Sequence, residues 1–315
     1  MSEIDIKGNN VNPSKCTEFF IGTAGWSYKD WVPVFYPKTQ TGGFDWLNFY
    51  AHYFNCVEVN STYYAYLSPK VVEGWINKVS DSDDFMFTVK LHQDFTHKKN
   101  FDRQKINAVC YNLDMLNKSG KLGGLLIQFP YSFAFNNVTA DYVRRLRDIF
   151  QKYNLFTEVR HSSWNHNNAM EMFAELKMTF CTIDQPQIGS AIQFNPVITN
   201  GRAYLRFHGR NTDAWMKSIN NFGRKQSYEE QNERYKYLYS PGELVEIEQK
   251  IKSVCERAKE IYVIMNNHPQ GEAVANAFEL IHLLEEKAKV DMPDTILKAF
   301  PRLGKFNSTQ MTLIE

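Results

Sequence analysis

The sequence predicts an α/β protein, a (β/α)₈ TIM-like barrel, and three observations support this fold class. From Phe19 onwards, a short apolar run followed by a helix-like stretch recurs about eight times. Each run ends in charged, amide or imidazole side chains, as barrel strands do at their catalytic face. Hydrophobic residues make up 43% of the 315 positions, enough for one large core. We therefore expect one barrel domain over 18–300, a flexible N-terminal extension over 1–17 and a C-terminal tail over 301–315.

The apolar runs predict the strands in chain order, and most are rich in β-branched and aromatic residues. They are Phe19–Trp26, Cys56–Asn60, Phe85–Lys90, Leu125–Pro130, Phe156–Arg160, Thr179–Asp184, Ala203–Gly209 and Ile261–Asn267. Apolar residues at helical spacing, such as Leu244, Ile247 and Ile251, predict helices that pack on the barrel wall. An open doubly wound sheet is the alternative, but no G-x-G-x-x-G motif follows the first run.

The long connection after the seventh run predicts an insertion over 211–241. Long loops at the C-terminal face of a barrel are commonly lids or substrate clamps. The insertion contains the segment RYKYLYSPGEL, in which strand-like alternation places Tyr235, Tyr237 and Tyr239 on one face. Tyr237 is therefore a candidate for lining the pocket. The alternative is that the three tyrosines pack against the barrel.

Charge and composition narrow the function classes. The formal net charge of +1 provides no global field for nucleic acid or membranes, so any anion site must come from local clusters of basic residues. The start of the sequence has no signal-peptide pattern, and no stretch approaches the roughly 20 apolar residues of a membrane span. The five cysteines have no paired spacing, which favours reduced thiols. We expect a cytoplasmic protein with no membrane partner.

Eight segments resemble one known family in their order and in their residues. They are IGTAGWSYKDW, FNCVEVNSTYY, FTVKLHQDFTH, LLIQFP, EVRHSSW, YLRFHGRN, RYKYLYSPGEL and NNHPQGEAVANA. Together they resemble the DUF72, or YecE-like, family of uncharacterised proteins over about residues 19–290. The resemblance implies a TIM-like barrel and no established activity. The barrel of this family has been likened to metal-dependent endonucleases of the endonuclease IV type, which is analogy alone.

Carboxylates and imidazoles at the strand ends are the candidate catalytic residues. They are Glu58, Glu158, Asp184 and His208. Carboxylates and imidazoles from different strands can hold a divalent metal that activates water, although the local ligand spacings H-x-H and H-E-x-x-H are missing. Without a metal, Glu158 and Asp184 could divide acid and base roles. The alternative is a buried charge network in which these carboxylates pair with Lys90, Arg160 and Arg206. Whether a metal is bound stays open.

Basic and aromatic residues near the same ends indicate an anionic, phosphate-bearing ligand, either a small molecule or nucleic acid. Amide donors before a helix N-terminus, in the loops after the last strands, are a common phosphate site of barrels. Loop aromatics beside cations can stack sugars or unpaired bases. The candidate binding residues are Trp26, Tyr28, Lys90, His97, Arg160, His161, Trp164, Arg206, Tyr237, Asn267 and His268. For the arginines, the alternative is that they only neutralise the carboxylates.

The C-terminal tail carries a separate motif. Gln310, Met311, Leu313 and Ile314 resemble the short peptide by which bacterial DNA-metabolism proteins dock onto the sliding clamp. Ile314 stands where an aromatic residue is usual. The prediction is clamp docking through these four residues, and an inert tail is the alternative.

Three functions remain open at the level of the sequence. The first is a hydrolase that acts at the C-terminal mouth of the barrel on a phosphate-bearing substrate, a class that includes substrates derived from nucleic acid. The second is a barrel that binds an anion or DNA without turnover. The third is sugar isomerase or glycosidase chemistry, for which the separation of the two carboxylates is decisive.

Overall fold

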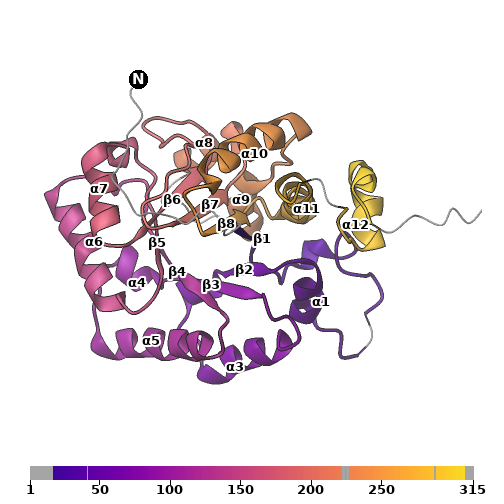
Figure 1. Cartoon of the computed structure of the whole chain (residues 1–315), viewed down its shortest axis with the longest axis horizontal. Helices are drawn as coiled ribbons and strands as arrows, with labels where there is room; N and C mark the ends of the chain where they lie inside the picture. Colours follow the sequence, from indigo (N-terminus) through magenta and orange to yellow (C-terminus); the bar gives the residue numbers. More distant parts are fainter. Residues whose placement is uncertain (1–16, 41, 222–223, 225–226, 287–288, 309–315) are drawn as a thin grey trace, which may run out of the picture.

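Eight parallel strands close into a barrel in chain order. Figure 1 shows the computed structural model, which describes residues 17–40, 42–221, 224, 227–286 and 289–308. The strands are β1 (Glu18–Ala24), β2 (Cys56–Val59), β3 (Met86–Lys90), β4 (Leu122–Gln128), β5 (Leu155–Glu158), β6 (Thr179–Asp184), β7 (Arg202–Phe207) and β8 (Glu260–Met265). The predicted TIM-like barrel is confirmed. The tail residues Gln310, Met311, Leu313 and Ile314 lie outside the described residues.

Helices surround the barrel (Figure 1). The longer ones are α1 (Trp46–Tyr53), α3 (Pro69–Lys78), α5 (Arg103–Lys118), α6 (Asn137–Phe150), α7 (Asn167–Glu175), α10 (Pro241–Cys255) and α11 (Glu272–Leu284). Short helices are α2 (Ser61–Tyr64), α4 (Gln93–Thr96) and α12 (Asp294–Ala299). None of the helices in the described part of the chain is long and apolar enough to span a membrane.

The sixth unit departs from the predicted alternation. Between β6 and β7, residues 185–201 contain no helix. Pro186, Gly189 and Pro196 interrupt this segment, and such residues break helical hydrogen bonding or favour turns. The segment crosses the outside of the barrel as an irregular connection instead.

Aromatic rings fill the lower half of the barrel. Phe20 stacks on Tyr262 with ring centroids 4.7 Å apart, and Phe156 stacks on Tyr204 at 4.4 Å. Gly123 of β4 leaves room for this layer, because a Cβ there would lie 2.9 Å from the Tyr262 ring. The packed layer is the floor on which the polar residues at the strand ends stand.

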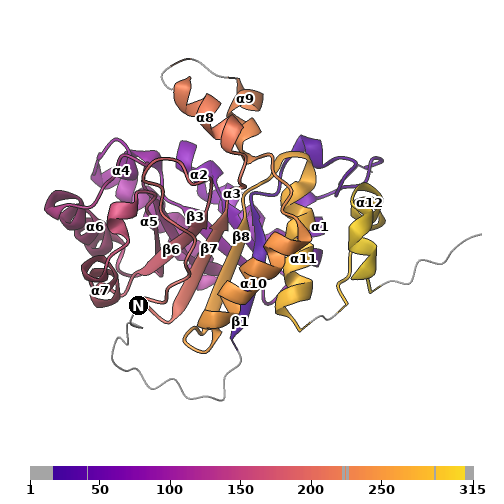
Figure 2. The ribbon, with the colours of Figure 1, turned by 90° about the horizontal axis from the view of Figure 1, so that it is seen from above.

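The predicted insertion after β7 forms an arm over the C-terminal ends of the strands. Its helices α8 (Thr212–Asn220) and α9 (Tyr228–Asn232) project beyond the barrel in Figure 2, and the 3₁₀ turn Glu233–Tyr235 follows them. The Asn211 side chain donates to the carbonyl oxygens of Glu233 and Lys236 at 3.3 and 3.2 Å. These bonds join the two ends of the arm at its base.

Candidate functional site at the barrel mouth

One guanidinium lies between two carboxylates at the centre of the barrel. Arg206 of β7 donates from Nε and Nη2 to the two oxygens of Glu58 on β2, at 2.8 and 2.7 Å. Its Nη1 donates to Glu158 on β5. All three side chains are at most 2% exposed. The bidentate geometry makes this a strong buried ion-pair network, and it occupies much of the acceptor capacity of both carboxylates.

Tyr204 extends this network toward the aromatic floor. Its hydroxyl donates to Glu58 Oε2 at 2.8 Å and lies 2.7 Å from Oγ1 of Thr88. Sequence reasoning did not single out Tyr204. The signal was present, since side chains two residues apart on a strand share a face, and Tyr204 precedes Arg206 by two positions.

Glu158 is held ionised by two arginines. Arg160 donates from Nε to Glu158 Oε1 at 2.7 Å, and Arg206 binds the other oxygen. Burial alone would raise the pKa of Glu158, but the two guanidinium groups outweigh it and hold the pKa well below its usual range. A carboxylate of this kind is a poor proton donor and a weak base near neutral pH.

His208 is a neutral imidazole inside the barrel. Its Nδ1 lies 2.8 Å from the Asn266 amide nitrogen, and its Nε2 lies 3.7 Å from Glu158 Oε1 and 3.5 Å from Arg160 Nη2. Burial lowers the pKa of His208 to about 3. An Asn266 amide that donates to Nδ1 leaves the ring proton on Nε2, directed toward Glu158.

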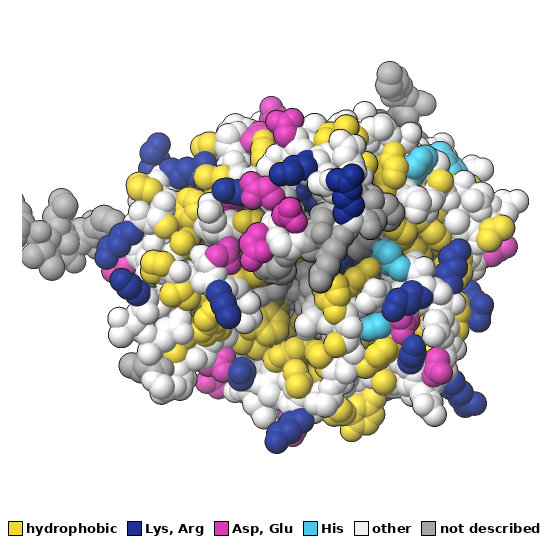
Figure 3. Space-filling model, turned by 180° about the vertical axis from the view of Figure 1, so that it is seen from behind, with side chains coloured by type: hydrophobic (Ala, Val, Ile, Leu, Met, Phe, Trp, Pro, Cys, Tyr) yellow, Lys and Arg dark blue, Asp and Glu magenta, His cyan; other side chains and the backbone are white. Residues whose placement is uncertain are grey.

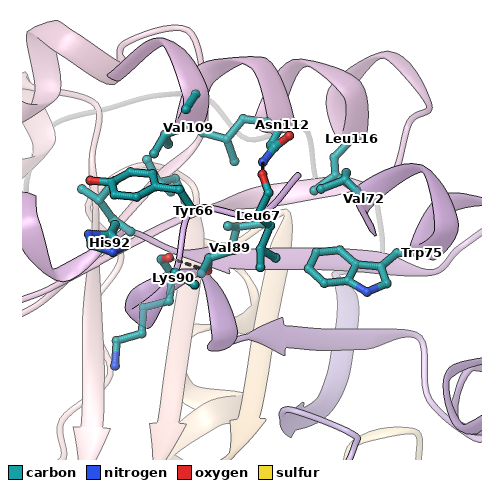
Figure 4. A pocket seen from close by; sticks show the side chains of 16 residues that line it. Tyr66, Leu67, Val72, Trp75, Val89, Lys90, His92, Val109, Asn112 and Leu116 are labelled. Carbon is teal, nitrogen blue, oxygen red and sulfur yellow. Dashed lines mark hydrogen bonds between the residues drawn. The ribbon is translucent and has the colours of Figure 1, made fainter. Parts of the chain in front are cut away.

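Lys90 of β3 has no anionic partner at its ammonium group. In the described part of the chain, its Nζ makes no hydrogen bond or ion pair; it lies 4.3 Å from the centroid of the Tyr63 ring. Burial and the nearby Arg206 lower the pKa of Lys90 to about 7, although Glu58 and Glu158 oppose the shift. Figure 4 shows the side chain pointing away from the other labelled side chains. Lys90 therefore loses its proton far more readily than an ordinary lysine.

The pocket drawn in Figure 4 is a separate feature outside the barrel. It holds about 30 Å³, room for about one water molecule, and lies between α3, α5 and β3. Its lining is mostly apolar, with Val72, Trp75 and Val89 among the contributing residues. The Lys90 backbone borders this pocket while its amine points to the opposite side of the strand. We do not assign chemistry to the apolar pocket.

The arm brings aromatic rings to the barrel mouth. The Tyr235 ring centroid lies 6.1 Å from that of His208, 5.8 Å from that of His268 and 6.0 Å from that of Trp215. The Trp215 ring centroid of α8 also lies 5.9 Å from the Arg160 guanidinium carbon, and among the described residues its buried indole nitrogen has no hydrogen-bond partner. Trp215 and Tyr235 therefore lie at the mouth, next to His208 and Arg160 of the charged network.

Figure 3 shows the face of the molecule that carries this mouth. A hollow near its centre is bordered by hydrophobic side chains, and histidine and basic side chains gather to one side. The mixed lining is typical of a site that binds a ligand with both an apolar and an anionic part.

Asp184 does not join the other candidate carboxylates. It ends β6, but its oxygens accept from Arg210 Nε at 2.9 Å and from the Tyr239 hydroxyl at 2.6 Å. Cys181, three positions earlier, is the β6 residue whose pKa responds to Glu158, and alternation places Asp184 on the opposite face. The structure therefore separates the proposed Glu158 and Asp184 acid-base pair.

Two predicted ligand-binding residues lie in structural positions. Trp164 has no exposed surface, and its indole donates to the Phe133 carbonyl at 2.7 Å within the core. His161 precedes the same short turn, where its Nδ1 accepts from the Ser163 amide at 3.1 Å. The expectation that Trp164 contacts a ligand was wrong, because the chain after β5 folds its ring inward under α7.

At the predicted phosphate site before α11, the polar groups already bind other groups of the protein. Asn267 is fully buried and donates to the Tyr237 carbonyl at 2.8 Å and to Asn276 Oδ1 at 2.9 Å. The first residue of α11 is Glu272, and burial raises its pKa to about 7. One of its oxygens is buried and has no partner in the described part of the chain. A carboxyl group at this helix N-terminus disfavours phosphate there. The anion-binding expectation falls instead on Lys90 and Arg160.

The remaining candidates border the mouth or support its wall. His268 stacks on Tyr28 with ring centroids 4.5 Å apart, and burial lowers its pKa to about 4. Trp26 is half-buried and packs edge-on against Trp75. His97 lies at the rim with part of its ring exposed, and partial burial, Lys90 and Arg160 lower its pKa. Its Nδ1 lies 3.2 Å from the Tyr63 hydroxyl, and the same Tyr63 ring faces Lys90.

The tyrosines of the RYKYLYSPGEL segment divide between two environments. Tyr235 faces the mouth, as its ring contacts show. Tyr237 donates to Glu243 Oε1 at 2.6 Å, and Tyr239 is fully buried against Asp184. The predicted shared face is wrong, because the turn at Glu233–Tyr235 breaks the strand-like alternation.

The donor set does not resemble a metal centre. Among the described residues, no group of three or more His, Cys, Asp or Glu side chains is arranged to hold a metal ion. Arg206 lies between Glu58 and Glu158, where a cation shared by them would have to sit. The network fits a guanidinium in that place.

Comparison with known proteins identifies the family. The family described as "Protein of unknown function DUF72" matches residues 20–299. The chain belongs to the DUF72 family. The UPF0759 protein YunF of Bacillus subtilis is 27% identical over 278 residues, which cover 84% of this chain and 94% of YunF. The UPF0759 protein YecE of Escherichia coli is 29% identical over 142 residues, which cover 45% of this chain and 48% of YecE.

Solved DUF72 structures share the barrel. A DUF72 family protein from Thermotoga maritima superposes with a TM-score of 0.73 and 30% identity, covering 85% of this chain and 99% of its own. Another, from Enterococcus faecalis, gives a TM-score of 0.72 and 24% identity, covering 85% and 95%. The resemblance read from the sequence is confirmed. Since the DUF72 name carries no activity, the chemistry has to be argued from the mouth itself.

Proposed function

We propose that this DUF72 protein is an enzyme that binds an anionic, phosphate-bearing substrate at the C-terminal mouth of the barrel and hydrolyses it there. One observation carries the proposal: two cations at the mouth keep unused binding capacity. Arg160 uses Nε on Glu158, while its Nη1 has no hydrogen bond among the described residues. Lys90 Nζ has no anionic partner in the same part of the chain.

Charge balance at the mouth supports an anionic ligand. The two negative charges of Glu58 and Glu158 offset those of Arg206 and Arg160, so protonated Lys90 leaves a surplus of one positive charge. Arg160 binds Glu158 through Nε, and its Nη1 is left for a ligand. A guanidinium edge and an ammonium group that both face the mouth match the oxygens of a phosphate.

The proton chemistry follows from the pKa values. Glu158 and His208 titrate well below neutral pH, so neither is a strong base at pH 7. Lys90, with a pKa of about 7, is the best-matched base. In this proposal, its neutral amine takes a proton from the attacking water, and Arg160 stabilises the charge that develops on the phosphoryl oxygens.

The anion site is tested first by binding. Isothermal titration with inorganic phosphate and a phosphorylated sugar should show saturable binding to the wild type. Arg160→Met should weaken it by about tenfold or more, since a charge-assisted bond to a ligand is worth roughly 1.5–3 kcal/mol. Arg144→Met is the matched control, because Arg144 forms an exposed ion pair with Asp141 on α6. Equal binding by all three proteins would refute the anion site.

Turnover is tested separately by phosphate release from a panel of phosphomonoesters and from DNA with an abasic site. The proposal predicts release that Lys90→Met reduces by about 100-fold or more, the usual contribution of a general base. Phosphate binding without release from any member would favour the second candidate, an anion-binding barrel without turnover. Glycosidase chemistry is less well supported, because it needs a carboxyl group of raised pKa paired with a second carboxylate; Glu158 in the network has the opposite shift, and Glu272, whose pKa is raised, stands outside the network at the start of α11.

A further inference from the structure

We propose that Lys90 is an amine nucleophile that forms a covalent imine with the aldehyde or ketone carbon of a phosphate-bearing substrate. The inference rests on the anion site proposed above and names a substrate class for it. It adds a reaction that hydrolysis does not require: attachment of the substrate to the protein through Lys90.

The position of the amine supports this role. Lys90 is the last residue of β3, in register with Leu126 of β4, and its side chain leaves the strand on the side opposite the apolar pocket. Thr88, two residues earlier, lies against Tyr204 in the network, so Lys90 is on the same inward face. The amine is therefore directed into the barrel mouth.

The surroundings of the amine keep it available. In the residues that the structure describes, no carboxylate lies within ion-pair distance of Nζ, in contrast to Lys98 and Lys105, which both pair with Asp94. The Tyr63 ring, 4.3 Å away, offers a π face instead of a counter-ion. Burial of a lysine beside other cations is one way in which proteins obtain a neutral, nucleophilic amine at physiological pH.

The groups that face Lys90 agree with this setting. Arg206 and Arg160 favour its neutral form, while Glu58 and Glu158 favour the charged form and burial is the largest influence. His97 responds in turn to Lys90 and Arg160. Since both carboxylates are bound by Arg206, their field at Lys90 is largely offset.

The reaction balances with groups at hand. The nitrogen lone pair attacks the carbonyl carbon, the C=O π electrons move to oxygen, and a proton passes from nitrogen to that oxygen to give a carbinolamine. A second proton assists departure of the oxygen as water, leaving a protonated imine. Amine, carbonyl compound and one proton thus give iminium and water. No oxidant or reductant is consumed.

Trapping the imine is the direct test. The full-length protein is incubated at pH 7 with glycolaldehyde phosphate and sodium cyanoborohydride, which reduces the imine to a stable secondary amine. Intact-mass and peptide mass spectrometry should show one dominant adduct, on Lys90, formed at least about tenfold faster than on any other lysine. The rate should reach half its maximum near pH 7, whereas an ordinary lysine titrates at about 10.4.

Variants separate the amine from the anion site. Lys90→Met should lose the dominant adduct, and Lys98→Arg, on an exposed ion-paired lysine, should keep it. Arg160→Met should slow labelling by glycolaldehyde phosphate by about tenfold. Labelling by unphosphorylated glycolaldehyde should change less between the wild type and the Arg160 variant than labelling by glycolaldehyde phosphate does, because this aldehyde has no phosphate for Arg160 to bind. Circular dichroism confirms that each variant is folded.

The outcomes are decisive for this proposal. Adducts spread evenly over surface lysines, or undiminished labelling in the Lys90 variant, would overturn it. Trapping without phosphate release in any hydrolysis assay would support the imine and reject hydrolysis. Phosphate release without a trapped adduct would support hydrolysis and reject the imine. A parallel reaction with duplex DNA containing an abasic site distinguishes the source of the carbonyl: a borohydride-stable protein–DNA band indicates DNA, and labelling by the small aldehyde alone indicates a sugar phosphate.

Discussion

Arg206 occupies the point in the barrel where two carboxylates converge, and this placement decides which neighbouring residues remain available for a ligand. Its guanidinium binds Glu58 with two nitrogens and Glu158 with the third. The carboxylates that resembled catalytic groups in the sequence are thus bound from within the protein. The residues with free capacity are Lys90 and Arg160.

Replacing Arg206 tests the cost of breaking this arrangement. Arg206→Met leaves two buried carboxylates without their shared partner, and removal of one member of a buried ion pair costs about 3–5 kcal/mol. We expect a loss of this size in the free energy of unfolding measured with urea. Arg202→Met on the same strand is the matched control, because Arg202 pairs with Glu260 near the surface. Its loss should be about 1 kcal/mol or less.

Comparable losses for the two variants would contradict this account. They would mean that the Arg206 network is no more stabilising than a partly exposed pair. Replacement of both carboxylates, Glu58→Gln with Glu158→Gln, in the Arg206→Met background should recover part of the loss, since the uncompensated charges are then removed.

Lys90 should be a destabilising residue at neutral pH. Its pKa of about 7 in the folded protein lies below its ordinary value of 10.5, so between these limits the unfolded chain binds the extra proton. Stability then rises with pH from 7 to 10.5 through this residue, and below pH 7 the full cost is present. We expect Lys90→Met to melt at a higher temperature than the wild type at pH 7, with a smaller difference at pH 9.5. A lower melting temperature at pH 7 would show that attraction to Glu58 and Glu158 outweighs burial.

At the scale of elements, the strands were predictable because each one combines an apolar run with a polar end. The face of the strand on which each side chain lies was less predictable. Asp184 ends its strand as Glu158 does, yet the register of β6 turns it outward to Arg210 and Tyr239. A period of two along one strand is readable in a sequence, but which of its two faces points inward is set by pairing with neighbouring strands.

Connections were predicted less well than strands for a related reason. The insertion after β7 was expected, but the turn that separates Tyr235 from Tyr237 and Tyr239 is held by Asn211 at the other end of the arm. Trp164 was assigned to a loop surface, and its place in the core follows from packing on Phe133 and Phe173. The arm contacts of Asn211 and the ring packing of Trp164 are both tertiary interactions, which local sequence patterns do not encode.

The base of the arm after β7 packs closely against a glycine. Gly209 has a φ of 82°, and a Cβ there would lie 2.7 Å from the Tyr237 Cβ. Gly209→Ala should therefore displace the segment that carries Tyr235 and weaken phosphate binding in the titration described above. Gly201→Ala is the matched control, because Gly201 has a φ of 62° with nothing within 4 Å. Both variants carry the backbone strain of about 1–3 kcal/mol, and only Gly209→Ala adds the collision.

Equal stability and equal phosphate binding in the two glycine variants would show that the arm adjusts freely. A larger loss for Gly209→Ala in both measurements would tie the position of the arm to the anion site.

Considered as a whole, the barrel arranges its interior in layers. Stacked aromatic rings, including Tyr204 and Tyr262, form the lower layer, the Arg206 network lies above it, and Lys90, Arg160 and the arm residues surround the mouth. Each layer supports the next, because the Tyr204 hydroxyl bonds upward to Glu58 and Glu58 binds Arg206. The charged layer is thereby fixed on a rigid floor, which suits a site that must hold its geometry in the absence of ligand.

The same layering makes the stability of the whole molecule sensitive to acid through His208. The groups that face this imidazole are Glu158, Arg160 and Arg206. Its pKa is about 3 in the folded protein and 6.5 ordinarily, so between these values the unfolded chain binds one more proton. Stability from this residue is complete above pH 6.5 and falls as the pH decreases toward 3, by about 1.4 kcal/mol per pH unit. In His208→Gln, the free energy of unfolding measured with urea should fall less steeply between pH 6 and pH 4, by that amount per pH unit. An unchanged pH dependence would mean that His208 is protonated together with its surroundings rather than held neutral by the barrel.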